Sequence, residues 1–346
     1  MMRSAFEIVD TRVVAGSRST VDIPMAGLYT HTPVTLPVHV VHGHRAGPVL
    51  FVSAAVHGDE INGVEIIRRL IRSPALGKLR GTLLAVPIVN VFGFHNRSRY
   101  LPDRRDLNRS FPGSEQGSMA SRVANLFLRE IVQRADYGVD LHTAAIHRDN
   151  LPQVRANLSN EQIERMAMAF GAPVVIHSEG IEGSLRMAAM EQGVPMILYE
   201  AGEALRFDEL CIRTGLRGVV EVMRTLGMLP RPKAKRRPAI LLRSSVWVRA
   251  SKSGILRSVV SLGTSVASGD TLGIVSDPFG EREVEIVSTA DGVIIGRANL
   301  PLVYEGEALF HIGRSQSGTA VEAHLEELQQ GLDEAQQEAP DELPIV

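Results

Sequence analysis

An apolar run that stops abruptly at a charged turn is the feature that most constrains how this chain can fold. Residues 50–56 read as a buried strand, the tetrapeptide His57-Gly58-Asp59-Glu60 interrupts it, and residues 61–72 follow with helical spacing of their apolar side chains. A strand that passes directly into a helix is typical of α/β proteins, which bind their ligands at the carboxyl ends of the strands. The turn is therefore the first place to look for a functional site.

The alternation of strand and helix recurs through the first two thirds of the chain. Its Val/Leu/Ile runs are continuous, which indicates strands buried on both faces. Short alternating segments before residue 48 indicate β hairpins that lead into the first central strand. Together these patterns predict an α/β domain over residues 1–230. The expected strands are 48–56, 82–89, 137–142, 173–178 and 195–200, and the expected helices are 61–72, 121–135, 161–170, 185–193 and 211–227.

Composition changes after the α/β pattern ends. Residues 231–238 are rich in proline and basic residues, which is typical of an extended linker between domains. Residues 239–313 hold short β-rich runs separated by glycine, which predicts a small all-β domain of barrel-sandwich type. Residues 314–346 are acidic, and we expect them to be mostly disordered.

Overall composition excludes several classes of function. The formal net charge is −2, which gives no case for a nucleic-acid partner. The single cysteine, Cys211, rules out an intrachain disulfide and a cysteine-rich zinc module, and it suits a reducing compartment. No apolar run is long enough for a membrane helix. We therefore expect a cytoplasmic protein, and any metal ligands must be His, Asp or Glu.

His57 and Glu60 are the first candidate metal ligands. The pair also fits an ordinary strand-end histidine followed by an acid at a helix N-terminus. A third residue, His142, ends the expected strand 137–142, and it would emerge at the same edge if the two strands are parallel. Two histidines and one glutamate leave a position open on tetrahedral Zn²⁺, as hydrolytic zinc sites do. Asp59 and Asp140 could orient the imidazoles or could be surface acids.

Further candidates are arginines and a glutamate near the same sheet edge. In the loop after strand 82–89, Arg99, Asn108 and Arg109 are placed to bind a substrate carboxylate or to stabilise an oxyanion. Glu200 ends an apolar strand and could act as a proton shuttle, although it could also be an acid at a helix N-terminus. Arg186 is either a second anion contact or a surface helix residue.

Five separated motifs resemble the succinylglutamate desuccinylase/aspartoacylase family of zinc-dependent deacylases. The resemblance covers about residues 45–313, and it implies a zinc-carboxypeptidase-like mixed sheet flanked by helices. The motifs are HGDE at 57–60, RY at 99–100, DLNR at 106–109, DLH at 140–142 and YEAGE at 199–203.

This resemblance implies one zinc ion per chain and a role for each candidate. An active-site tyrosine that aspartoacylases take from their second domain has no secure counterpart, and Tyr304 is the nearest candidate. The implied roles are zinc ligand for His57, Glu60 and His142, oxyanion stabiliser for Arg99, substrate anchor for Asn108 and Arg109, further carboxylate contact for Arg186, and general base for Glu200.

The β-rich segment also looks like a biotinyl or lipoyl carrier domain. Such a carrier needs a lysine at a hairpin tip, and no lysine follows Lys252. A lid or dimerisation domain is therefore the better interpretation, and a homo-oligomer is possible.

The expected function is hydrolysis of the amide bond of a small N-acyl amino acid or N-acyl amine. A metallocarboxypeptidase acting on the C-terminal residue of a peptide is the alternative within the same fold, and a non-catalytic binding protein is the other. Serine-hydrolase, P-loop and dinucleotide-binding motifs are missing from the sequence.

Overall fold

A computed structural model describes residues 3–230, 239–314, 321, 323–327 and 329–330. The predicted linker 231–238 lies outside the described residues, as does most of the acidic segment. Within that segment residues 321, 323–327 and 329–330 are helical, and Val321 is buried against Leu151 and Val293. The division into domains stays a prediction.

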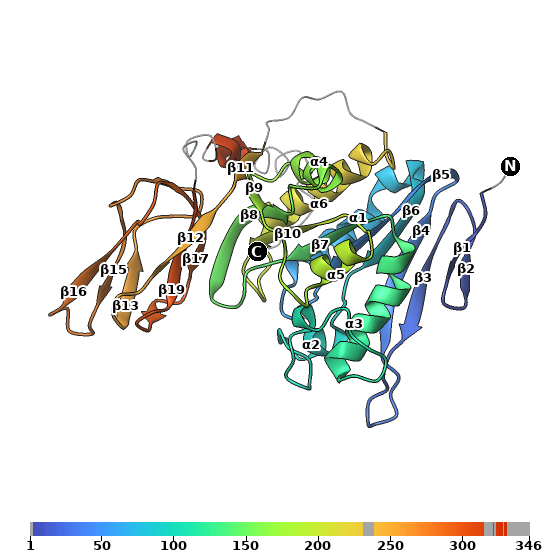
Figure 1. Cartoon of the computed structure of the whole chain (residues 1–346), viewed down its shortest axis with the longest axis horizontal. Coiled ribbons are helices and arrows are strands. Elements are labelled where there is room, and N and C mark those ends of the chain that lie inside the picture. The colour runs from blue at the N-terminus through green and yellow to red at the C-terminus, as the bar shows by residue number, and fades with distance from the viewer. Residues whose placement is uncertain (1–2, 231–238, 315–320, 322, 328, 331–346) are drawn as a thin grey trace, which may run out of the picture.

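A large mixed sheet forms the centre of the molecule (Figure 1). Among the described residues, thirteen strands belong to it, and its main path runs in the order β12-β19-β17-β8-β10-β7-β5-β6-β4-β3. Its strands are β3 (Ser17–Pro24), β4 (Thr35–His42), β5 (Arg45–Ala54), β6 (Arg80–Val86), β7 (Tyr137–His142), β8 (Arg148–Ala156), β9 (Val174–His177), β10 (Met196–Gly202), β11 (Ile240–Leu242), β12 (Ser245–Arg249), β14 (Ser265–Val266), β17 (Gly292–Ala298) and β19 (Ala308–Arg314).

Two smaller sheets and the helices complete the described structure. One smaller sheet pairs β1 (Phe6–Ile8) with β2 (Thr11–Val13). The other has the strand order β16 (Glu283–Val287), β15 (Thr271–Ser276), β13 (Gly254–Ser258) and β18 (Leu302–Val303). The α-helices are α1 (Asn62–Arg72), α2 (Val91–His95), α3 (Met119–Glu130), α4 (Glu161–Phe170), α5 (Leu185–Glu191) and α6 (Glu209–Thr225), and the 3₁₀ turns are η1 (Pro74–Lys78), η2 (Leu107–Arg109) and η3 (Val132–Arg134). The predicted fold class, a mixed sheet flanked by helices with a further all-β region, is confirmed.

The middle of the large sheet is parallel. Strand β5 pairs in parallel with both β6 and β7, and β7 pairs in parallel with β10. The carboxyl ends of β5, β7 and β10 therefore lie at one edge of the sheet. This parallel arrangement is the condition under which His57 and His142 were predicted to lie close together. The register also places Glu200 of β10 directly beside His142 of β7.

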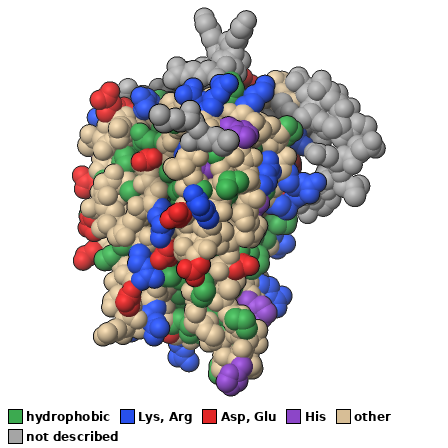
Figure 2. All heavy atoms as spheres, turned by 90° about the vertical axis from the view of Figure 1, so that its right-hand side faces the viewer, with side chains coloured by type: hydrophobic (Ala, Val, Ile, Leu, Met, Phe, Trp, Pro, Cys, Tyr) green, Lys and Arg blue, Asp and Glu red, His purple; other side chains and the backbone are tan. Residues whose placement is uncertain are grey.

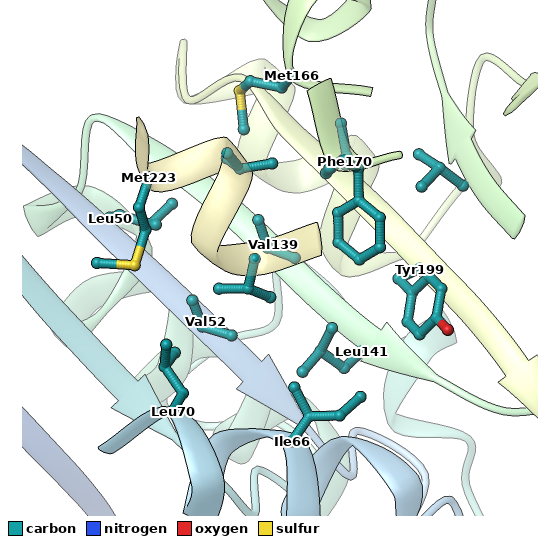
Figure 3. Close-up of a cluster of buried hydrophobic side chains, with 14 of the residues drawn as sticks. Leu50, Val52, Ile66, Leu70, Val139, Leu141, Met166, Phe170, Tyr199 and Met223 are labelled. Carbon is teal, nitrogen blue, oxygen red and sulfur yellow. The ribbon is translucent and has the colours of Figure 1, made fainter. Parts of the chain in front are cut away.

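Alternate residues of these strands enter two cores on opposite faces of the sheet. Leu50 and Val52 pack with α1, α4 and α6, whereas Phe51 packs with α3 and α5. Figure 3 shows the first core, in which the ring of Tyr199 stacks on Phe170 at a centroid distance of 4.8 Å. Each such side chain contributes about 1.5–3 kcal/mol when fully buried. These two cores fix the strand ends on which the functional residues lie.

Strand β8 was missed by the sequence analysis, and it joins the α/β region to the β-rich segment. It pairs antiparallel with β10, and its first residues pair with β17 while its last residues pair with β9. Pro152 lies where β8 changes neighbours, a position where a missing N–H is tolerated. This proline and the charged residues around it hide the strand from pattern reading.

None of the helices in the described part of the chain is long and apolar enough to cross a membrane. Figure 2 shows acidic and basic side chains interspersed over the face that carries the N-terminal strands.

Candidate metal and active site

A tight turn after β5 carries the first two candidate ligands. A Cβ atom added at Gly58 would lie 2.0 Å from the backbone carbon of Gly93, so only glycine lets this turn pack against α2. The packing places His57 and Glu60 at the sheet edge, where their side chains are only 4% and 2% exposed. A local constraint on Gly58 therefore positions both candidate ligands.

His57, Glu60 and His142 form a compact buried group. One potential ligand atom from each lies within 4.8 Å of the others. The Nδ1 atom of His57 lies 2.6 Å from Glu60 Oε1, and the Nδ1 atom of His142 lies 2.8 Å from Glu60 Oε2. Two imidazoles and a carboxylate converge on one point, which is a donor set that hydrolytic zinc sites use.

Carboxylates also hold the outer nitrogens of both imidazoles. His57 Nε2 lies 3.2 Å from Asp106 Oδ1, and His142 Nε2 lies 2.6 Å from Asp140 Oδ2. The Ser53 hydroxyl donates a 2.7 Å hydrogen bond to the other oxygen of Asp140. Contacts of this kind fix the orientation of a ligating imidazole.

The suggestion that Asp59 could orient an imidazole is wrong for His57. The carboxylate that reaches the His57 ring belongs to Asp106, which is the N-cap of η2 and 49 positions away in the chain. Asp59 Oδ1 is buried without a hydrogen-bond partner among the described residues. Sequence proximity favoured Asp59, but the two ring nitrogens of His57 contact Glu60 and Asp106 instead.

The charges of this group strongly shift the pKa values of its members. Burial opposes ionisation of Glu60, but the two neighbouring imidazoles outweigh it and hold the pKa of that carboxyl far below its usual range. Burial likewise opposes protonation of His142, yet Asp140 and Glu60 raise the pKa of the imidazole well above its usual range. The group therefore retains protons that a bound cation would replace.

Arg99 lies beside the candidate ligands. Its Nη1 atom lies 3.3 Å from Glu60 Oε1, and its Nη2 atom lies 2.9 Å from Asp106 Oδ2. The side-chain amide of Asn90 donates to the Arg99 carbonyl oxygen and so anchors the loop. These contacts fix a guanidinium group at the edge of the candidate metal position.

A cavity of about 260 Å³ opens over this sheet edge. Eight of the residues singled out from the sequence line it, although they come from segments far apart in the chain. They are His57, Glu60, Arg99, Asn108, Arg109, His142, Arg186 and Glu200.

Glu200 is held by one of its two carboxylate oxygens. Asn150 Nδ2 donates to Glu200 Oε2 over 2.9 Å, and Arg155 Nη2 lies 3.0 Å from the same oxygen. The preceding residue, Tyr199, faces the opposite side and is buried in the core. The second Glu200 oxygen, Oε1, accepts no hydrogen bond from a described residue, so it is left for a ligand.

The remaining anion-binding candidates lie around α5. Asn108 Oδ1 accepts a 2.9 Å hydrogen bond from the Leu185 backbone N–H, and Arg109 Nη1 donates to the Asn108 carbonyl oxygen. Arg186 is buried, with Nη2 bound to Ser178 Oγ over 2.9 Å and Nη1 unpaired among the described residues. Burial, with a contribution from the charge of Arg155, lowers the pKa of Arg186 to about 10.

Sequence reasoning missed the other residues that line the cavity, among them three polar or charged residues and a tryptophan. Arg148, Asn150 and Arg155 come from β8, and Trp247 comes from β12 in the β-rich segment. Tyr304, the candidate from the same segment, is 79% exposed and is not among the residues that line this cavity. The one available signal was that Trp247 is the only tryptophan in the chain.

The family model of the succinylglutamate desuccinylase/aspartoacylase catalytic domain matches residues 46–226, just over half of the 346 residues. The chain belongs to this family.

Individual members of the family match much of the chain. N-alpha-acetyl-L-2,4-diaminobutyric acid deacetylase of Halomonas elongata is 29% identical over 283 residues, which cover 76% of this chain and 81% of the relative. Succinylglutamate desuccinylase of Pseudomonas aeruginosa is 30% identical over 183 residues, about half of each protein.

Solved structures agree with the fold. The product-bound ectoine utilization protein EutE (DoeB) of Ruegeria pomeroyi has a TM-score of 0.77 and 25% identity, covering 86% of this chain and 95% of that one. A succinylglutamate desuccinylase from Silicibacter sp. TM1040 has the same TM-score and identity and covers 86% and 94% of the two chains.

Proposed function

We propose that this protein is a zinc-dependent amidohydrolase that removes the acyl group from an N-acyl amino acid or a related small N-acyl amine. The observation that carries the proposal is the buried His57–Glu60–His142 group, which shares one cavity with Glu200 and Arg99. Membership of a deacylase family and the deacylase relatives support it.

The donor set fits a zinc ion. Both imidazoles and the carboxylate are buried and converge, and the outer nitrogens already have acidic partners. His57, Glu60 and His142 would hold the metal, with one ion per chain. A zinc ion bound there would lower the pKa of a bound water to about 7 and polarise the substrate carbonyl.

Glu200 is the proposed general base. Asn150 and Arg155 hold one of its oxygens, and the other is left for the attacking water. Glu200 takes one proton from that water as the water oxygen bonds to the acyl carbon. It delivers this proton to the amine nitrogen as the C–N bond breaks, so that a carboxylic acid and an amine are the products.

The surrounding cations have two proposed roles. Arg99, which already lies beside Glu60, stabilises negative charge that develops on the carbonyl oxygen. Asn108 and Arg109 bind the carboxylate of the amino acid, and Arg186 adds a further positive charge nearby. These roles follow the family resemblance, and all of these residues line the cavity.

A panel of N-acyl amino acids, tested on zinc-loaded protein beside dipeptides with the same C-terminal residue, would test this function. We expect hydrolysis of at least one acyl amino acid to be much faster than hydrolysis of the matched dipeptide. Faster cleavage of the dipeptide would favour the metallocarboxypeptidase alternative, and no cleavage of either would contradict the proposal.

A further inference from the structure

Strand β17 of the β-rich segment reaches the proposed general base through Asn150 of β8. The antiparallel pairing of β17 with β8 places Gly296 directly across from Asn150, and on its other side Gly296 pairs with His311 of β19. Asn150 Nδ2 in turn donates a 2.9 Å hydrogen bond to Glu200 Oε2. One side chain therefore separates the backbone of the β-rich segment from Glu200.

Lack of space explains the glycine at position 296. Its φ angle does not lie in the left-handed region, so the backbone conformation does not require glycine. Gly296 is buried, and a Cβ atom added to it would lie 2.7 Å from Asn150 Oδ1. The next nearest atoms, His311 Cβ and the Asp149 carbonyl oxygen, would lie at the ordinary contact distances of 3.4 and 3.5 Å. A glycine inside a strand often marks such a close approach, and here the approaching group is the amide of Asn150.

The amide of Asn150 cannot give way to a methyl group without weakening its contact with Glu200. Its oxygen and nitrogen belong to one planar group, with the oxygen next to Gly296 and the nitrogen on Glu200 Oε2. Asn150 is only 7% exposed, so its side chain has little room for another position. Displacement of Oδ1 by a methyl group would therefore also move Nδ2 away from the carboxylate.

A β-bulge in β17 holds the residue that lies directly across from Glu200. The register of β10 and β8 pairs Glu200 with Gln153, but Gln153 Nε2 donates a 3.0 Å hydrogen bond to the Ile295 carbonyl oxygen. Ile295 is the extra residue of the bulge. Bulges are common next to active sites, where they redirect side chains. This bulge binds Gln153, and it is Asn150 whose amide reaches Glu200.

We propose that Gly296 is a positioning residue for Glu200 and acts through Asn150. The missing side chain of Gly296 lets Asn150 hold Glu200 Oε2, so that Oε1 stays directed at the attacking water. This inference rests on the proposed deacylase function, because that function makes Glu200 the base. The β-rich segment thus controls the proton transfer without contributing a group to it.

A double-mutant cycle of Gly296→Ala and Asn150→Ala tests this role. Each single variant should lower kcat about 10- to 100-fold, as the loss of one hydrogen bond to a charged group allows, and should change KM much less. In the Asn150→Ala background, Gly296→Ala should lower kcat less than about twofold further, because the oxygen that the methyl group would meet is gone. Bound zinc should be unchanged in all three variants. Losses that multiply in the double variant, or an unchanged kcat in Gly296→Ala, would overturn the role of Gly296.

A glycine on a neighbouring strand provides the matched control. Gly313 of β19 is buried in the same sheet, and a Cβ atom added there would meet Cδ1 of Leu242, the end of a flexible side chain. Gly313→Ala should leave kcat close to that of the unmodified protein. An equal loss of kcat in Gly313→Ala and Gly296→Ala would assign the effect to general damage of the sheet and overturn the proposal.

The double variant also covers the case in which Gly296→Ala alone does not fold. With the Asn150 oxygen removed, the double variant should fold and turn over like Asn150→Ala. A double variant that also fails to fold would place the conflict at another residue and overturn the action through Asn150.

A crystal structure of Gly296→Ala gives a readout that does not depend on turnover. Asn150 Nδ2 should lie more than about 3.5 Å from Glu200 Oε2, outside hydrogen-bond range, instead of 2.9 Å. A variant that keeps the 2.9 Å contact would overturn the role of Gly296 and leave the deacylase function in place. Loss of the contact in a protein that cleaves no acyl amino acid would overturn the deacylase function and keep the link from Gly296 to Glu200.

Discussion

The two ends of the cavity are built differently. At the metal end, each nitrogen of His57 and His142 faces a carboxylate, and the whole group is buried. At the arginine end, Arg148 rests on Trp247 and has no carboxylate partner among the described residues. The charges of the first end are paired with one another, whereas the second end presents a half-buried guanidinium group stacked on an aromatic ring. The proposed catalytic groups lie at the first end, and the β-rich segment contributes Trp247 to the second.

Replacing the proposed base should have the largest effect. Glu200→Gln keeps the shape of the side chain and its contacts near Asn150, but it cannot accept the proton from water. We expect kcat to fall about 10²- to 10⁴-fold with bound zinc unchanged. Steady-state kinetics measures the fall in kcat, and metal analysis measures the bound zinc. Glu203→Gln, a few residues further along, is the matched control, and similar turnover in the two variants would contradict the role of Glu200.

A change at the acid behind His142 should weaken the metal end without removing a ligand. Asp140→Asn keeps the shape of the 2.6 Å contact with His142 Nε2 but removes its charge. Variants of this kind typically lose about 10- to 100-fold in metal affinity or activity. Competition with a zinc chelator would measure the loss. Unchanged affinity would mean that Asp140 has no part in holding zinc.

The metal end should also respond to pH. In the metal-free protein the pKa of His142 is raised, so zinc must displace a proton from it below that pKa. We expect apparent zinc affinity to fall about tenfold per pH unit for each proton displaced as the pH is lowered. Zinc titrations at several pH values would measure the slope, and a flat profile would contradict the shift.

Stability of the metal-free protein should change in the opposite sense. The pKa of His142 is higher in the folded protein than in the unfolded chain, where it is about 6.5. The resulting stabilisation of the folded state is complete at pH values below the unfolded pKa, and it is lost as the pH rises through the folded pKa. Urea unfolding of metal-free protein should therefore show a lower free energy of unfolding at alkaline pH. His142→Gln should flatten this dependence, and an equally steep decline in the variant would assign it to another group.

The smallest effect on turnover is expected from loss of the contact between Arg155 and Glu200, which joins the two ends of the cavity. Arg155 donates to Glu200 Oε2 but is 28% exposed, so solvent screens part of the interaction. Arg155→Gln should lower kcat only about 3- to 10-fold and change KM less, since Asn150 still holds the same oxygen. Stopped-flow or steady-state kinetics would measure these changes in kcat and KM. A loss as large as that of Glu200→Gln would place Arg155 in direct contact with the reacting groups.

The metal end could be predicted because its residues follow local rules. His57 and His142 follow buried, parallel strands, and the carboxyl ends of such strands meet at one edge. Glu200 follows the same rule on β10, the next strand. For these residues, the hydrophobic pattern located the strand ends, and the parallel pairing of β5, β7 and β10 brings those ends together.

The arginine end could not be predicted because it depends on long-range pairing. Arg148 and Asn150 lie on β8, whose proline hides it, and β8 meets the β-rich segment through the pairing of Asn150 with Gly296. Trp247 lines the cavity because its strand, β12, belongs to the same large sheet as β8. Tyr304, the nearest candidate for the tyrosine that the family resemblance implied, is exposed. No local signal records which residue of a distant strand faces inward.

Hydrolysis as a function of added zinc tests the central claim most directly. Metal-free protein would be titrated with Zn²⁺ while the cleavage of an N-acyl amino acid is followed under saturating conditions. Activity should be negligible without metal, rise linearly with zinc, and level off at one equivalent per chain. Full activity in the metal-free protein, or one equivalent of bound zinc with no cleavage of any acyl amino acid, would contradict a zinc-dependent deacylase.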